Sequence, residues 1–220
     1  MSHSYKFYYF NIRSRGEHCR YTLYQSGVKF EDIRVDFESE WPDLKATIPF
    51  GMVPMLLIDN QHKIVQGKVI SQLIAAEHGL AGRNHIESAQ VFMLAYAVHD
   101  FHEHLWSAVQ LHVPDVMTDE IILKGKQVWH ESIKPFAFKE HSERFENCLK
   151  DNGGTWLIGE SVSWADLYQA EVMDRILNVL DPEALDAYPL LKHHHKRVHQ
   201  LPNIKRYCES RPKSAFNRDW

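Results

Sequence analysis

Three tyrosines near the start of the chain, Tyr5, Tyr8 and Tyr9, carry hydroxyl groups that could hold an anion. A tyrosine hydroxyl has an ordinary pKa near 10, so at neutral pH it keeps its proton and donates a hydrogen bond. The surrounding residues alternate and are rich in aromatic side chains, which predicts a strand over residues 5–10. Alternation places Tyr8 on the face opposite Tyr9, and these features alone do not choose one tyrosine for chemistry.

Histidines are a second group of residues that could do chemistry, because the chain has 15 of them. They gather at His99, His102 and His104 and again at His193, His194, His195 and His199. His195 and His199 are one helical turn apart, which is compatible with metal ligation on a helix face. The sequence has no His-Glu-x-x-His motif and no cysteine ligand near them. A solvated helix end, where cationic side chains suit the negative dipole, is therefore favoured, and no metal is expected.

The three cysteines, Cys19, Cys148 and Cys208, are far apart and form no C-x-x-C motif. An odd number of scattered cysteines favours a reducing compartment over a disulfide framework, so we expect a cytoplasmic protein. Disulfide exchange would need a low-pKa cysteine at the start of the first helix. The turn at 11–14 has none, and Cys19 lies a full turn inside that helix, where burial is expected.

The first 80 residues change repeatedly between strand and helix patterns, which predicts an α/β domain. Gly27 and Gly79 are expected to end its two helices. The predicted order is strand 5–10, helix 15–26, strand 29–36, strands 55–58 and 63–65 joined by a turn at 59–60, and helix 68–78. This βαβ-ββα order, with Pro54 at the head of the third strand, resembles the thioredoxin fold.

Almost everything after residue 85 has helical periodicity, so the chain is predicted to have two domains, 1–80 and an all-helical bundle at 85–220. Ser163-Trp164-Ala165-Asp166 reads as a capping box at the start of a helix. The expected helices are 85–113, 117–152 with a kink at Pro135, 163–180, and two shorter ones beginning at Pro189 and Pro202.

Composition excludes several classes of partner. The chain has 220 residues, 44% of them hydrophobic, and 25 Lys plus Arg against 29 Asp plus Glu. The resulting net charge of -4 gives no basic excess for nucleic acid. No apolar run approaches the roughly 20 residues of a membrane span, and the N-terminal residues lack the pattern of a signal peptide.

Motifs spread over nearly the whole chain together resemble one family. They are Tyr9-Phe10-Asn11 with Arg13, Arg15 and Glu17; Trp41 and Lys45; Pro49-Phe50-Gly51 with Val53-Pro54; Gln66; Asp100; Trp156-Leu157-Ile158-Gly159 with Ser163-Trp164-Ala165-Asp166; and Arg211-Pro212. This combination is similar to the sigma-type glutathione transferases, including the nematode and prostaglandin D synthase branches.

The resemblance implies that Tyr9 stabilises the thiolate of bound glutathione, with the positive charge of Arg15 in support. Lowering a thiol pKa from about 8.5 by roughly 2 units corresponds to about 2.7 kcal/mol. One or two charge-assisted hydrogen bonds, each worth roughly 1.5–3 kcal/mol, can supply that free energy.

The resemblance also implies contacts for the rest of glutathione. The glycyl carboxylate is expected at Trp41 and Lys45, and the cysteinyl backbone at Met52, Val53 and Pro54, with a cis peptide before Pro54. Gln66 and Gly67, at the start of a helix, would hold the γ-glutamyl carboxylate. Asp100 would reach the γ-glutamyl amino group of the neighbouring subunit, which implies a homodimer. The expected pocket for a hydrophobic electrophile is lined by Ile12, Ser14, His102, Trp106, Tyr168 and Val172.

The sequence departs from the family at Gly67, where Gln-Ser is usual. A missing hydroxyl contact to a charged group could weaken glutathione binding by roughly 1.5–3 kcal/mol, so Gly67→Ser is expected to tighten it. Some vertebrate members bind a metal at the dimer seam, but the matching positions here are Tyr96 and His99, and that site is not carried over.

Two functions follow from the resemblance. The first is an enzyme that conjugates glutathione to small hydrophobic electrophiles, with prostaglandin isomerase or peroxidase side activity, since all three use the same activated sulfur. The alternative is a weak or inactive member acting as a hydrophobic-ligand carrier or crystallin-like structural protein. The altered Gly67 position keeps this alternative open.

Overall fold

A computed structural model describes residues 3–109 and 119–213, and it divides the chain into two compact units. The first unit consists of the residues up to Leu80 together with those from Pro202 onward, and the second unit runs from Ala81 to Leu201. We expected the helical domain to extend to residue 220. The compact unit instead ends at Leu201, because the last helix, α9 (Pro202–Ser210), packs against the first helix of the chain.

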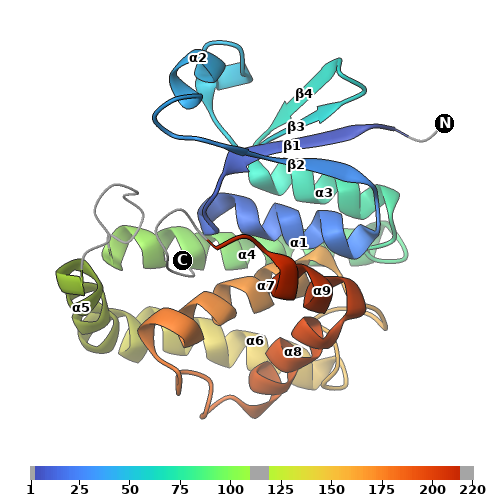
Figure 1. Ribbon diagram of the computed structural model, residues 1–220. Coiled ribbons are helices and arrows are strands. Elements are labelled where there is room, and N and C mark those ends of the chain that lie inside the picture. The colour runs from blue at the N-terminus through green and yellow to red at the C-terminus, as the bar shows by residue number, and fades with distance from the viewer. Residues whose placement is uncertain (1–2, 110–118, 214–220) are drawn as a thin grey trace. The chain divides into compact units, whose positions relative to one another are not determined.

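The first unit is built on a mixed four-stranded sheet in the order β2-β1-β3-β4 (Figure 1). Its strands are β1 (Tyr5–Phe10), β2 (Phe30–Val35), β3 (Met55–Ile58) and β4 (His62–Val65). β1 and β2 are parallel, whereas β1 with β3 and β3 with β4 are antiparallel. Asp59 and Asn60 both have positive φ in the β3–β4 turn. This is the thioredoxin-like arrangement predicted from the sequence.

Two longer helices, α1 (Glu17–Ser26) and α3 (Gly67–Glu77), pack on each other and share a core with β1. Gly27 ends α1 with φ 75°, a left-handed conformation that glycine adopts without steric cost. The part of the unit before Leu80 also contains a short helix, α2 (Trp41–Lys45), and 3₁₀ turns at Ser14–Gly16 and Pro49–Gly51. The sequence pattern predicted none of these three.

Helix α1 is buried more completely than an amphipathic helix would be. Every residue from Glu17 to Leu23 is buried, including Arg20. One reason is that α1 contacts α3 and also α9, so more than one side is covered within this unit. Polar residues of α1 must therefore find partners inside the protein.

In the described residues of the second unit, the regular secondary structure is all helical, and turns and loops connect the helices. Its elements are α4 (His85–Val109), α5 (Asp119–Val128), a π-helical segment (Trp129–Phe138), α6 (Lys139–Asp151), α7 (Trp164–Arg175), a second π-helical segment (Ile176–Leu180) and α8 (Pro189–Gln200). At Pro135 we predicted a kink in a long helix. Pro135 instead lies inside the first π-helical segment, where its missing backbone N–H goes with a change in the hydrogen-bond register of the helix. The predicted limits at 113 and 117 lie outside the described residues. Among the described helices, none is long and apolar enough to cross a membrane.

The capping box at the start of α7 is confirmed. The Ser163 hydroxyl accepts a hydrogen bond from the Asp166 N–H, and the Asp166 carboxylate accepts one from the Ser163 N–H at 2.8 Å. The same carboxylate accepts hydrogen bonds from the N–H of Leu157 at 2.8 Å and from Nε2 of His194 at 2.9 Å. The box therefore connects α7 to the preceding loop and to α8.

Replacing the capping hydroxyl is expected to destabilise the protein modestly. Ser163→Ala removes one N-cap acceptor and should lower the free energy of unfolding by about 1 kcal/mol. Urea denaturation followed by circular dichroism measures this change. Ser161→Ala, at an exposed serine two residues earlier, should change it by less than about 0.5 kcal/mol. Equal losses in both variants would contradict the capping role.

Candidate functional site

Tyr9 lies at the end of β1 with its ring directed into the core of the first unit. Its side chain is buried, and its oxygen accepts a hydrogen bond from the backbone N–H of Arg15 at 3.1 Å. A Cβ atom on Gly16 would lie 2.2 Å from the Tyr9 ring, so only glycine lets the chain pass this close. The start of α1 and the end of β1 are thereby fixed around the Tyr9 hydroxyl.

The surroundings of Tyr9 keep its hydroxyl protonated and polarise it. Burial raises the pKa of Tyr9 above its ordinary value, although hydrogen bonds from Ser14 and the Arg15 N–H and the positive charge of Arg20 act in the opposite direction. A protonated hydroxyl whose oxygen already accepts hydrogen bonds is a good donor to an anion. The Tyr9 hydroxyl can therefore donate a hydrogen bond to a bound anion, but it is not suited to act as a general base.

Arg20 is a site residue that our sequence reasoning missed. It donates hydrogen bonds to the carbonyl oxygens of Phe10 at 3.1 Å and Ile12 at 2.9 Å, and it pairs with Asp32 at 3.1 Å. These bonds fix the loop that carries Ser14 and Arg15 next to Tyr9. The sequence does contain one indication of this role, because Glu17 and Arg20 are three residues apart and can therefore form an ion pair on one face of α1.

Glu17 is the centre of a buried charge network beside this loop. Its Oε1 accepts hydrogen bonds from the Tyr207 hydroxyl at 2.8 Å and from Arg211 at 2.9 Å, and its Oε2 pairs with Arg20 at 3.4 Å. Burial alone would raise the pKa of Glu17, but the positive charges of Arg20, Arg211 and Arg13 outweigh it and lower the pKa to about 2. The carboxylate is therefore charged at neutral pH, and it connects α1 to α9 and the segment after it.

The two residues predicted to hold the glycyl carboxylate lie on α2. The Trp41 ring packs edge-on against Phe10, with ring centroids 5.3 Å apart. Lys45 is exposed, and a Cβ atom on Gly51 would lie 3.3 Å from its Cγ atom, so the lysine stem runs across Gly51. α2 thus carries an indole that contacts the end of β1 and a lysine whose stem lies on Gly51.

The segment before β3 has the geometry expected of a peptide-binding edge. The Val53–Pro54 peptide is cis, as predicted, and Val53 packs against both hydrophobic clusters of this unit. Gln66 donates a hydrogen bond from Nε2 to the Met52 sulfur at 3.2 Å, and it has a φ of 76° immediately before α3. Met52, Val53 and Gln66 are therefore neighbours although they come from different parts of the sequence.

Gly67 begins α3 and lies against His18 of α1. A Cβ atom on Gly67 would be 2.7 Å from Nε2 of His18 and 3.0 Å from the backbone oxygen of Arg15. His18 is buried and shares a hydrogen bond with Ser71 at 3.0 Å through Nδ1, which limits how far its ring can move. The imidazole therefore occupies the space that a serine side chain would need, and we revise the expectation that Gly67→Ser alone improves the site.

Gly67 and His18 should behave as a coupled pair. Gly67→Ser should overpack the site and lower the free energy of unfolding by about 1 kcal/mol, with weaker glutathione binding. Adding His18→Ala should relieve the clash, so the double variant should bind glutathione more tightly than His18→Ala alone. Calorimetric titration of the wild type and the three variants measures this coupling. Additive effects on binding would contradict it.

Four of the predicted electrophile-pocket residues, His102, Trp106, Tyr168 and Val172, are buried in the second unit. His102 hydrogen-bonds to the Tyr168 hydroxyl through Nδ1 at 2.9 Å and to Arg175 through Nε2 at 2.9 Å. Because Arg175 only donates, Nε2 accepts and Nδ1 carries the proton. The structure therefore joins three polar residues of this unit into one network.

The remaining predicted residues occupy different surroundings. Ile12 and Ser14 are half-buried in the first unit. Asp100 is exposed on α4, on the same helix face as the exposed apolar side chains of Met93 and Tyr96.

Thiol chemistry by Cys19 is disfavoured. Cys19 is fully buried in α1, and burial raises the pKa of its thiol to about 12. A redox-active cysteine needs the opposite, an accessible thiolate of low pKa. Cys19 instead donates a hydrogen bond to the Gly67 carbonyl at 3.3 Å, which is a packing role.

A thioredoxin-like unit with a cis-proline edge is followed in this chain by a helical unit, and comparisons with known proteins match each part to a domain family. Residues 5–76 match the family described as Glutathione S-transferase, N-terminal domain, and residues 122–211 match the corresponding C-terminal domain family.

Several known proteins are similar over almost their whole length. Glutathione S-transferase 1 of Ascaris suum is 33% identical over 212 residues, covering 96% of this chain and 98% of the relative. Hematopoietic prostaglandin D synthase of Gallus gallus is 34% identical over 219 residues, covering 97% and 99%. The crystal structure of monomeric Na-GST-3, a glutathione S-transferase of the hookworm Necator americanus, superposes with a TM-score of 0.86 at 29% identity, covering 97% and 100%. The chain belongs to the glutathione S-transferase family.

Proposed function

We propose that this protein is a sigma-type glutathione transferase that uses the Tyr9 hydroxyl to stabilise the thiolate of glutathione for attack on hydrophobic electrophiles. The observation that carries the proposal is the buried, protonated Tyr9 hydroxyl, held by Ser14 and the Arg15 N–H beside the cis-proline edge. Similarity to both nematode transferases and prostaglandin D synthase supports the sigma assignment.

The catalytic step needs little more than an ionised sulfur in the right place. The Tyr9 hydroxyl donates a hydrogen bond to the thiolate, which favours the charged form and lowers the thiol pKa. The positive charge of Arg15, close enough to act on Tyr9 itself, adds to this effect. The thiolate then attacks the electrophilic carbon while binding holds the two reactants together.

The remaining groups of the peptide have matching partners in the first unit. The backbone of Val53 pairs with the cysteinyl residue as an added strand, flanked by Met52 and Pro54. The indole N–H of Trp41 and the ammonium of Lys45 bind the glycyl carboxylate. Gln66 and the backbone N–H groups of Gly67 and Lys68, at the positive end of α3, bind the γ-glutamyl carboxylate.

The electrophile is bound by the predicted residues of the second unit, His102, Trp106, Tyr168 and Val172. Apolar walls with a few placed polar groups are typical of a pocket for small hydrophobic ligands. The same activated sulfur would serve conjugation, prostaglandin isomerisation or peroxide reduction. We propose that the protein works in the cytoplasm.

We further propose a homodimer in which Asp100 contributes to the partner's glutathione site. Its support is the exposed apolar surface on each unit, because Phe50 is 84% exposed in the first and Met93 is 63% exposed in the second. Exposed apolar side chains of this size are characteristic of protein interfaces. Sedimentation of the wild type and Asp100→Asn, with and without glutathione, tests assembly and the shared contact together.

Retention on immobilised glutathione, combined with turnover of a chloro-dinitro-arene, tests the proposed function. We expect the protein to be retained, eluted by free glutathione, and to form the conjugate. Retention without turnover of this or other electrophiles would point to a ligand carrier or a crystallin-like protein. Absence of both retention and turnover would overturn the proposal.

A further inference from the structure

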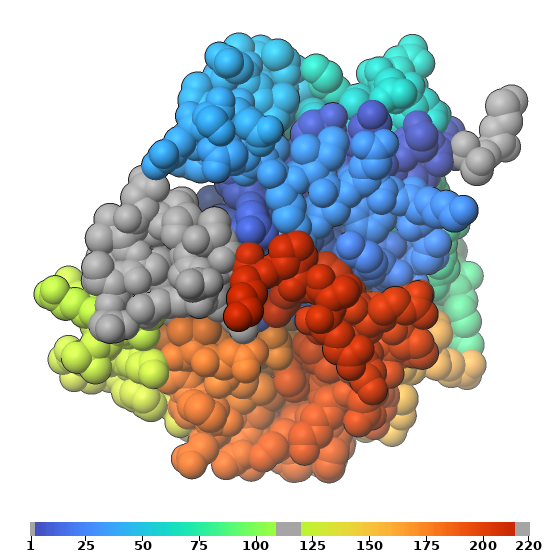
Figure 2. All heavy atoms as spheres, viewed as in Figure 1, coloured from blue at the N-terminus to red at the C-terminus, as the bar shows by residue number. Residues whose placement is uncertain are grey.

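A cluster of metal-ligand side chains on the second unit includes none of the residues proposed above for glutathione or the electrophile. Asp174 comes from α7, and His195 and His199 come from α8, which packs against α7. Figure 2 shows orange atoms of this α7–α8 region at the surface of the second unit. We propose that these three residues form a binding site for a divalent transition-metal ion such as Zn²⁺.

The spacing of the ligand atoms suits one ion. Oδ1 of Asp174 lies 3.2 Å from Nε2 of His195 and 3.6 Å from Nε2 of His199, and one ligand atom of each residue falls within 4.8 Å of the others. In a tetrahedral zinc site with bonds of 2.0–2.1 Å, neighbouring ligand atoms are about 3.3 Å apart. The distances of 3.2 Å and 3.6 Å from the Asp174 oxygen to the two histidine nitrogens are both close to this spacing.

The tautomer of His199 provides a second argument. Its Nδ1 donates a hydrogen bond to the His195 carbonyl oxygen at 2.8 Å, because a carbonyl can only accept. In the neutral ring, Nε2 then directs a lone pair toward the Asp174 carboxylate, which is also an acceptor. Two acceptors at this distance need a cation between them, either a second proton on the ring or a metal ion. A ligating histidine whose other nitrogen donates to a backbone carbonyl is a common zinc arrangement.

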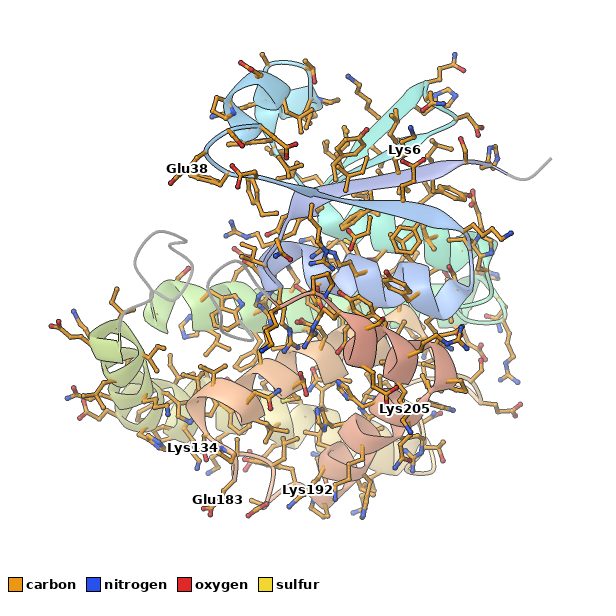
Figure 3. The ribbon with its side chains drawn as sticks, viewed as in Figure 1. Lys6, Glu38, Lys134, Glu183, Lys192 and Lys205 are labelled. Carbon is orange, nitrogen blue, oxygen red and sulfur yellow. The ribbon has the colours of Figure 1, made fainter. Side chains whose placement is uncertain are left out.

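Two basic side chains of α8 have partners outside the cluster. Lys192, labelled in Figure 3, forms an ion pair with Asp186, and Arg197 donates a hydrogen bond to the Thr155 carbonyl oxygen. The three ligand side chains are between 16% and 20% exposed, so an ion can reach them from solvent.

The ligand types indicate which metals the cluster would take. Two imidazoles and one carboxylate favour Zn²⁺, Cu²⁺, Ni²⁺ or Co²⁺ over Mg²⁺ and Ca²⁺, which prefer oxygen ligands. Three protein ligands leave a fourth tetrahedral position for water or another donor. Because the ligands come from two helices, a bound ion would also stabilise the packing of α7 on α8.

Calorimetric titration of the full-length, tag-free, chelator-treated protein with Zn²⁺ tests the site. We expect one ion bound per chain, and at least about tenfold weaker binding in Asp174→Asn and in His195→Gln. The matched control is His193→Gln, at an exposed histidine of the same helix, which should bind like the wild type. Circular dichroism confirms that each variant is folded.

Electron paramagnetic resonance of the Cu²⁺-loaded wild type gives a second readout that needs no variant. The spectrum should contain hyperfine structure from two imidazole nitrogens. Absence of saturable Zn²⁺ binding would mean that a proton, not a metal, lies between His199 and Asp174. Binding unchanged in both ligand variants would place the ion elsewhere, for example at cysteine. Either result overturns the proposal.

Discussion

Tyr9→Phe should lower kcat/KM for glutathione conjugation by about 10- to 100-fold. The substitution keeps the buried ring and removes only the hydroxyl that donates to the thiolate. A hydrogen bond to a charged group is worth roughly 1.5–3 kcal/mol, and each 1.4 kcal/mol corresponds to about tenfold in rate. Steady-state kinetics at pH 7 with saturating electrophile measures the loss.

The adjacent tyrosine provides the matched control for this prediction. Tyr8 is on the same strand but faces the other side of the sheet, where it packs with Ile48, Met55 and Val65. Tyr8→Phe also removes one phenol hydroxyl from β1, and it should leave kcat/KM within about twofold of the wild type. Equal losses in the two variants would show that the effect arises from the strand rather than from the Tyr9 hydroxyl.

Glu17→Gln should lower the free energy of unfolding by about 3–5 kcal/mol. The carboxylate is 1% exposed, and its loss leaves the guanidinium of Arg20, which is fully buried, with less compensating charge. It also weakens the hydrogen bonds from Tyr207 and Arg211. Because Arg20 fixes the loop carrying Arg15, reduced turnover should accompany the reduced stability. Urea denaturation at pH 7 measures the first effect.

The pH dependence of this difference follows from the pKa of Glu17. The folded-state pKa is lowered to about 2 from an ordinary value of 4.5, so the stabilising contribution is complete above about pH 5. It should disappear as the pH falls from 4.5 toward 2, where wild type and Glu17→Gln converge. Glu209→Gln is the control, because its pair with Lys205, labelled in Figure 3, is exposed and worth less than about 1 kcal/mol. A pH-independent difference would contradict the charge network.

Local patterns predicted the strands and most helix ends of the first unit well. Alternating aromatics predicted β1, Asp59 and Asn60 marked the β3–β4 turn, and Gly27 ended α1 with the expected left-handed φ. These features depend on residues close in sequence. The π-helical segment around Pro135 was not predicted, because periodicity indicates a helix without its hydrogen-bond register.

The candidate site was predictable only where a family motif marks the residue. His18 was missed because its contact with Gly67 joins residues of two helices that are 49 positions apart in the sequence, and nothing local to Gly67 indicates a neighbouring imidazole. Asp174 was missed for the same reason, since only the packing of α7 on α8 brings it to His195. The role of Arg20 was not predicted, because it depends on buried hydrogen bonds to the Phe10 and Ile12 carbonyl oxygens that the sequence pattern does not indicate.

Ultraviolet titration of the thiolate of bound glutathione, in the wild type and Tyr9→Phe, tests the central claim most directly. In the wild type we expect the bound thiol to ionise with a pKa roughly 2 units below the free value of about 8.5. Loss of one charge-assisted hydrogen bond should raise the bound-thiol pKa in Tyr9→Phe by roughly 1–2 units. An unchanged pKa in Tyr9→Phe would mean that another group stabilises the thiolate, and it would contradict the role assigned to Tyr9.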